Sequence, residues 1–155
     1  MPGSNLKFAI LLLLICIVAG CSSIHLAKEA DTLASAGEWD EAVLKYSELY
    51  KKEPRNLDYK IRYTRAKFEA AQIHHSRGVE QLEKGNHQAA LLEFQAALFL
   101  DPSLDKARVL LEKTKRLMDS VYYYGKGLEE LIKGNERLAK SSFKKSLSLN
   151  PDNEL

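Results

Sequence analysis

Apolar and small residues return every three or four positions over two long stretches of the chain, the spacing of one face of an α-helix. The first stretch contains Leu57, Ile61, Thr64, Phe68, Ala71, His75, Gly78 and Leu82. The second contains Leu104, Ala107, Leu111, Thr114, Met118, Val121, Gly125, Leu128 and Ile132. Because 57–70 and 105–119 lack Gly and Pro, we predict continuous helices over Leu57–Lys84 and Leu104–Lys133. A break near residue 71 or 120 is the alternative.

Each stripe is expected to pack against the shorter helices on either side, because its small residues suit close contact between helices. A coiled coil could use the same stripe. The first helix would contain 28 residues and extend about 42 Å at 1.5 Å per residue.

A second pattern occurs three times: "GEWDEAVLKYSELYKKEP" (Gly37–Pro54), "GNHQAALLEFQAALFLDP" (Gly85–Pro102) and "GNERLAKSSFKKSLSLNP" (Gly134–Pro151). The spacing from Gly to Ala, then to an aromatic residue and then to Pro is the same in each copy. The shared positions are Ala42, Tyr46 and Pro54; Gly85, Ala90, Phe94 and Pro102; and Gly134, Ala139, Phe143 and Pro151.

These residue types suit a helical hairpin. Gly can adopt the positive φ that ends one helix and turns the chain. Ala and the aromatic residue lie four apart, on one face of the next helix, and Pro closes that helix. Asn86 and Asn135 are expected to cap the N-terminus of the helix that follows them.

The pattern resembles the tetratricopeptide repeat, a helix-turn-helix of about 34 residues. With the Ala position aligned, the repeats are about 23–56, 71–104 and 120–153, and the eighth position, which the family keeps small, holds Ala30, Gly78 and Gly127. The resemblance implies an all-α array of about three helical hairpins. The copies recur after 48 and 49 residues, and we attribute the surplus to the two long helices.

The N-terminus predicts export. Lys7 precedes an apolar run, Phe8–Val18, that is too short to span a bilayer, and "VAGC" follows it. This resembles a bacterial lipobox, which implies a cleaved signal peptide over 1–20, a lipid attached to Cys21 and a mature domain over 21–155. With Cys16 removed and Cys21 acylated, no thiol remains for a disulfide or a metal.

Composition and motifs predict a protein without catalytic chemistry or cofactor, apart from the lipid. Without Lys7 the chain has 22 basic and 21 acidic side chains (23 − 1 against 21) and no charged block, which argues against nucleic acid. Adjacent His74 and His75 point apart on a helix, so we predict no metal site. No Gly-x-Ser-x-Gly motif or Gly-rich phosphate loop is present, and no small-molecule substrate is expected.

The resemblance places the first helix of each repeat on the inner surface, where such arrays bind partners. The predicted partner-binding residues are Gln72, His75, Val79 and Leu82 in the second repeat, and Val121, Tyr124, Leu128 and Leu131 in the third. These side chains suit a segment with apolar anchors. The last helix, with Leu138, Phe143 and Leu147, has no following helix to cover it, which predicts that another protein covers it or that a longer ancestral chain was shortened.

Together these features predict a lipid-anchored periplasmic scaffold that binds another envelope protein. Ser22 after the cysteine resembles outer-membrane sorting signals. "GEWDEA" and "FQAALFLDP" resemble the repeat region that precedes the secretin domain in type II secretion or pilus channels, so a secretin or pilus component is the candidate partner. A pilotin-like escort of a secretin, a general envelope lipoprotein and a structural homo-oligomer are the alternatives.

Overall fold

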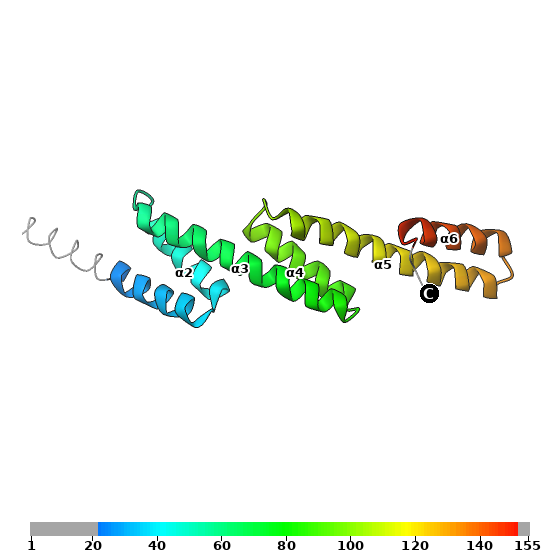
Figure 1. The fold of residues 1–155 in the computed structure, drawn as a ribbon, viewed down its shortest axis with the longest axis horizontal. Coiled ribbons are helices and arrows are strands. Elements are labelled where there is room, and N and C mark those ends of the chain that lie inside the picture. The colour runs from blue at the N-terminus through cyan, green and yellow to red at the C-terminus, as the bar shows by residue number, and fades with distance from the viewer. Residues whose placement is uncertain (1–21, 152–155) are drawn as a thin grey trace, which may run out of the picture. The chain divides into compact units, whose positions relative to one another are not determined.

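The computed structural model describes residues 22–151. Within that range the chain forms six helices and no strand: the first helix (residues 22–36), α2 (Trp39–Lys52), α3 (Leu57–Glu83), α4 (His87–Leu100), α5 (Asp105–Ile132) and α6 (Glu136–Leu149) (Figure 1). The predicted all-α class is confirmed. The signal peptide and Cys21 lie outside the described residues. The chain divides into two compact units at Ala70 and Ala71, inside α3.

Both long helices predicted from the sequence are present. α3 has 27 residues and α5 has 28, and neither breaks near residue 71 or 120. Within unit 2 (residues 71–151 of the described range), α4 lies alongside the first half of α5 and α6 alongside its second half (Figure 1). One helix thus takes part in two successive hairpins.

Three glycines make the turns between paired helices, as predicted. Gly37, Gly85 and Gly134 have φ angles of 79°, 75° and 77°. After α3 the N–H of Gly85 donates to the carbonyl of Leu82 at 3.0 Å, and the N–H of Asn86 donates to that of Gln81 at 2.9 Å. This pair of bonds is the Schellman motif, which satisfies carbonyls at a helix end and requires a left-handed residue.

The predicted capping role of Asn86 and Asn135 is wrong. Both occupy the N-cap position, but neither side chain bonds to the helix that follows. Instead each side-chain amide donates backward, Asn86 to Gln81 Oε1 at 2.9 Å and Asn135 to Glu130 Oε2 at 2.8 Å. The preceding helix offers a polar acceptor five residues away, and this bond braces the turn.

The core of unit 1 (residues 22–70 of the described range) joins the first helix, α2 and the first half of α3. Its buried residues are Leu26, Ala30, Ala42, Tyr46, Leu49 and Ala66. From α3, Tyr59 and Tyr63 also pack against this cluster, and the rings of Tyr50 and Tyr63 stack with centroids 6.1 Å apart. The first half of α3 therefore uses the face that carries Tyr59, Tyr63 and Ala66.

The predicted packing of the first stripe is wrong in this half of α3. Leu57, Ile61, Thr64 and Phe68 are exposed. The reason is that Tyr59, Tyr63 and Ala66 repeat at the same helical spacing on the opposite face, and the rings of that face fill more of the core. In the second half of α3 the stripe is correct for Ala71 and Gly78, which are buried.

The core of unit 2 forms between α3, α4 and α5. It contains Ala71, Ala90, Phe94, Ala97, Leu104, Ala107 and Leu111. The second stripe, which begins at the N-cap Leu104 and continues along α5, is again half correct: Leu104, Ala107, Leu111 and Thr114 are buried, but Val121, Leu128 and Ile132 are exposed. The second half of α5 turns Ser120 and Gly127 toward α6 instead, because these small residues admit a closer approach.

Each hairpin of unit 2 has an aromatic ring packed directly on a helical glycine. A Cβ atom added to Gly78 would lie 2.6 Å from Cε1 of Phe94, and one added to Gly127 would lie 2.6 Å from Cδ1 of Phe143. Carbon atoms in contact normally lie about 3.5–4.0 Å apart. Both helix pairs therefore depend on the absence of a side chain at this repeat position. In unit 1 the equivalent position is occupied by Ala30.

Candidate functional site

The partner-binding residues predicted for the second repeat are half-buried. Gln72, His75, Val79 and Leu82 all lie on α3, and Val79 and Leu82 pack against the core of unit 2. The ring of His75 lies 6.1 Å from that of Phe94. The second half of α3 thus brings these side chains together, but they mainly pack between the helices of the hairpin.

The surroundings of His75 favour the neutral form of its imidazole. Burial, followed by the positive charge of Lys106 on α5, lowers the pKa of its imidazole. Its Nε2 is buried without a hydrogen-bond partner. An unsatisfied buried nitrogen costs free energy, and protonation without a partner would cost more. His75 therefore acts here as a packed ring between α3, α4 and α5.

The neighbouring His74 binds across the hairpin, with its Nδ1 2.7 Å from Glu93 Oε2 on α4. Within residues 22–151 no three His, Cys, Asp or Glu side chains gather in an arrangement that could hold a metal ion. Over the same range no helix combines the length and apolar character needed to cross a bilayer.

The residues predicted for the third repeat are more accessible. Tyr124 is half-buried, with its ring 5.7 Å from that of Phe143. Leu128 and Leu131 are 41% and 51% exposed, and Val121 is exposed as well. Sequence reasoning missed Ile132 of α5, which is 87% exposed, although it lies at the end of the predicted stripe.

The α5–α6 hairpin exposes more apolar surface than the hairpin before it, which provides an internal comparison. Phe94 on α4 is fully buried, whereas Phe143, its equivalent on α6, is only half-buried. Leu98 packs against the core of unit 2, whereas its equivalent Leu147 is 53% exposed. The first half of α5 covers α4, and among the described residues no helix covers α6 in the same way.

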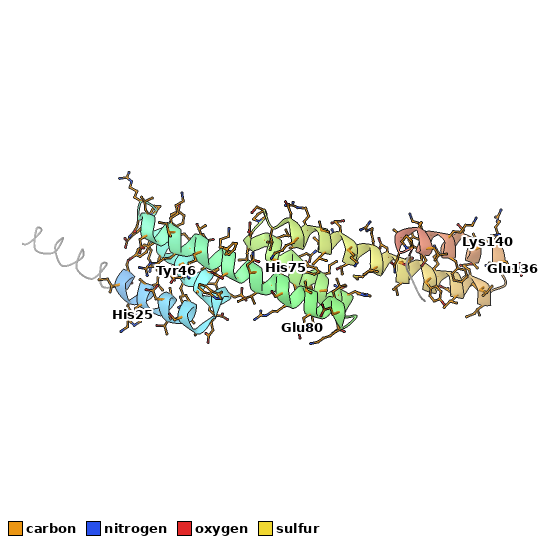
Figure 2. All side chains as sticks on the ribbon, in the orientation of Figure 1. His25, Tyr46, His75, Glu80, Glu136 and Lys140 are labelled. Atoms are coloured by element: carbon orange, nitrogen blue, oxygen red, sulfur yellow. The ribbon has the colours of Figure 1, made fainter. Side chains whose placement is uncertain are left out.

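Polar side chains predominate on another face of the α5–α6 hairpin. Glu136 and Lys140 extend from α6 (Figure 2). Between α5 and α6 lies a hollow of about 440 Å³, lined by Tyr123, Lys126, Glu130, Leu138, Ser141, Ser142 and Lys145. Leu138 is the one leucine of this lining, whereas Leu128, Leu131 and Leu147 lie outside it.

Unit 1 contains a half-buried network that sequence reasoning missed. The Tyr46 hydroxyl donates to Asp31 Oδ1 at 2.6 Å, and Arg62 donates to both carboxylate oxygens at 2.6 Å. Burial acts to raise the pKa of Asp31, but the bonds from Tyr46 and Arg62 and the charge of Arg62 outweigh it and lower that pKa. Burial and the bond to Asp31 raise the pKa of Tyr46 to about 12.

This network is structural in character. It joins the first helix, α2 and α3, and Tyr46 lies among these helices (Figure 2). Asp31 and Arg62 also line a hollow of about 370 Å³ with Trp39 and Arg65. Since both charged groups already neutralise each other, the hollow offers a substrate no free acid and base pair.

Comparison with known proteins agrees with the helical hairpins. A family model described as a tetratricopeptide repeat matches residues 121–153, the second half of α5 and α6. A search of curated proteins found no match. Repeats of this type bind other proteins and are typically not catalytic. The chain thus contains a tetratricopeptide repeat over residues 121–153, within an all-helical fold.

Proposed function

We propose that the chain is a lipid-anchored scaffold that binds another protein of the bacterial envelope through the α5–α6 hairpin. The observation that carries this is the exposure of Leu128, Leu131 and Leu147 in that hairpin, while their equivalents Val79, Leu82 and Leu98 in the α3–α4 hairpin are half-buried. Apolar side chains that cluster on the surface of a soluble domain mark interaction sites.

The anchor and the partner rest on sequence features. The lipobox-like "VAGC" supports acylation of Cys21, and Ser22 supports placement at the periplasmic face of the outer membrane. The likeness to secretin-associated repeats supports a secretin or a pilus component as the partner. Stable attachment requires more than one acyl chain, and the lipoproteins that this N-terminus resembles carry three.

Site-specific photocrosslinking in the host cell tests the binding surface. A photoreactive residue at Leu131 should form an adduct with another envelope protein, and one at exposed Lys113 on the first half of α5 should not. Mass spectrometry of the adduct distinguishes a secretin or pilus component from any other partner. An adduct only with a second copy of the chain would favour the homo-oligomer and contradict the scaffold.

Metabolic labelling with a palmitate analogue tests the anchor separately. Wild-type protein and Cys16→Ala should incorporate the label, because the signal peptide containing Cys16 is removed. Cys21→Ala should incorporate none. Equal labelling of Cys21→Ala and the wild type would contradict lipidation at this residue.

A further inference from the structure

The exposed apolar side chains of the first half of α3 form a strip that the fold itself does not use. Leu57, Ile61 and Phe68 are 71%, 66% and 50% exposed, and exposed Thr64 lies between them. Their spacing of four, three and four residues places them in one line along the helix. We name Leu57, Ile61, Thr64 and Phe68 the α3 strip.

The core of unit 1 lies on the other side of this helix. Tyr59, Tyr63 and Ala66 pack into that core. At 100° per residue these three positions fall roughly opposite the α3 strip. The strip is therefore separate from the core of its unit, and it is also distinct from the α5–α6 surface of unit 2.

The repeated architecture does not require an apolar strip at this place. When Pro54 is aligned with Pro102, the strip positions correspond to Asp105, Val109, Glu112 and Arg116 of α5. Three of these four are charged, so the equivalent half of α5 presents a polar outer face. The apolar residues of α3 thus need a reason other than the folding of a helical hairpin.

The two sides of the α3 strip carry mainly positive charge. Lys60 and Lys67 lie along one side, and Arg65 and Asp58 lie along the other. The carboxylate of Asp58 is engaged by Arg62 Nε at 2.8 Å, and Arg65 Nε lies 3.9 Å from Glu69 Oε1. Lys60 and Arg65 line an open hollow of about 600 Å³ together with Ile61, Thr64 and Phe68. The strip is consequently a narrow apolar seam with basic edges.

A seam of this form fits a helix. Residues spaced by four and three positions interdigitate with a second amphipathic helix, and the residues beside the seam select the charge of the partner. We propose that the α3 strip binds an amphipathic helix of another protein, whose apolar seam is flanked by acidic side chains.

A second copy of the chain fits this seam poorly. In an antiparallel pair Lys60 and Lys67 would face the same residues of the other copy, and in a parallel pair they would face Arg65. Both arrangements place like charges together at the edge of the seam, which is unfavourable. A bilayer surface generally takes a wider apolar face than a seam one residue across.

Peptide binding to the full chain in phosphatidylcholine nanodiscs tests this assignment. The probe is a fluorescent three-heptad peptide with Ile and Leu at the seam positions and Glu at the flanking positions. A matched peptide carries Lys in place of Glu. We expect the Glu peptide to bind about tenfold more tightly at low salt, with the difference shrinking as salt rises.

Variants locate the binding. Ile61→Gln should abolish it, whereas Val109→Gln should leave it unchanged, because Val109 is the equivalent position on α5 and is also 66% exposed. Lys60→Glu combined with Arg65→Glu should reverse the preference toward the Lys peptide. Circular dichroism should show the helix content of the wild type in every variant, since these positions are exposed.

Other outcomes would overturn the proposal. Equal affinity for both peptides, or no binding of either, would exclude selection by the basic edges. Association of two nanodiscs that depends on Ile61 would show that the α3 strip binds a second copy of the chain. Burial in lipid of a nitroxide label at residue 61, in nanodiscs that contain phosphatidylglycerol and no peptide, would assign it to a membrane.

Discussion

Gly78 and Gly127 set how closely the helices of unit 2 approach, because an aromatic ring occupies the space where a side chain would begin. Gly125, on the same helix as Gly127, has no neighbour within 4 Å of an added Cβ. All three are helical glycines, and glycine inside a helix weakens it. Their substitution by alanine therefore separates close contact from helix propensity.

We expect Gly78→Ala to lower the free energy of unfolding by about 1–3 kcal/mol, because the added methyl group overlaps the Phe94 ring. Gly125→Ala should raise it by about 0.5–1 kcal/mol through helix propensity alone. Urea unfolding of residues 22–155 measures both. A gain of stability in Gly78→Ala would mean that the ring is not packed on the glycine.

His75 makes the stability of the fold depend on pH. Its pKa in the folded chain lies below the ordinary value of 6.5, so the unfolded chain binds a proton first as the pH falls. The contribution of neutral His75 to the free energy of unfolding is therefore complete above pH 6.5. It is lost as the pH falls from about 6.5 toward the lower pKa of the folded chain.

His75→Leu should flatten the loss of stability between pH 7.5 and 5.5, because leucine has no proton to bind. The urea midpoint at the two pH values is the measurement. His25→Gln, which changes an exposed histidine of the first helix (Figure 2), is the control and should keep the wild-type dependence. An unchanged slope in His75→Leu would assign the dependence to other groups.

At the scale of the elements, α5 and α6 are joined by two buried serines where α3 and α4 have alanines. Ser146 Oγ donates to the Ser120 carbonyl at 2.9 Å, and Ser120 Oγ lies 3.1 Å from the Ser146 carbonyl. The equivalent residues are Ala71 and Ala97, both fully buried. The same close helix contact is thus built once from hydroxyls and once from methyl groups.

Each single change, Ser120→Ala or Ser146→Ala, should lower stability by about 1 kcal/mol, since a buried hydrogen bond is lost and its partner remains. The double change should cost less than the sum, because it recreates the alanine pair of the preceding hairpin. A double-mutant cycle from urea unfolding measures this coupling. Simple additivity would show that the two hydroxyls act independently.

The elements were largely predictable, because local spacing determines them. The glycine turns and the two long helices follow from residues that are close in sequence. Local spacing does not determine which face of a long helix is buried. Ile61 and Tyr63 belong to stripes of equal spacing on opposite faces of α3, and only the fit of their side chains to the core decides which stripe is buried. The network of Asp31 and Arg62 joins residues 31 positions apart, which no local pattern indicates.

The candidate site was predictable to a smaller extent. Leu128 and Leu131 are exposed on α5, but Gln72 and Val79 are half-buried on α3. The difference arises from the first half of α5, which packs beside α4 and brings Lys106 close to His75. The spacing of the α3 strip predicts a packed face, because the same spacing occurs in buried and in exposed stripes.

At the scale of the whole molecule, long helices take the place of the short connections of a simple repeat array. A helix that serves two hairpins packs one face in each half and leaves another face exposed. On the first half of α5 the exposed face carries Val109, and on the first half of α3 it carries Ile61. The joining of two hairpins by one helix depends on that helix being continuous.

The most direct test of this claim is the distance along α5, which lies wholly in unit 2. Spin labels at Val109→Cys and Glu129→Cys, in a chain of residues 22–155 that lacks both native cysteines, should give one narrow distance distribution. Twenty residues of unbroken helix predict about 30 Å between the backbone positions at 1.5 Å per residue. A broad distribution centred well below that value would show a break near residue 120 and contradict the account.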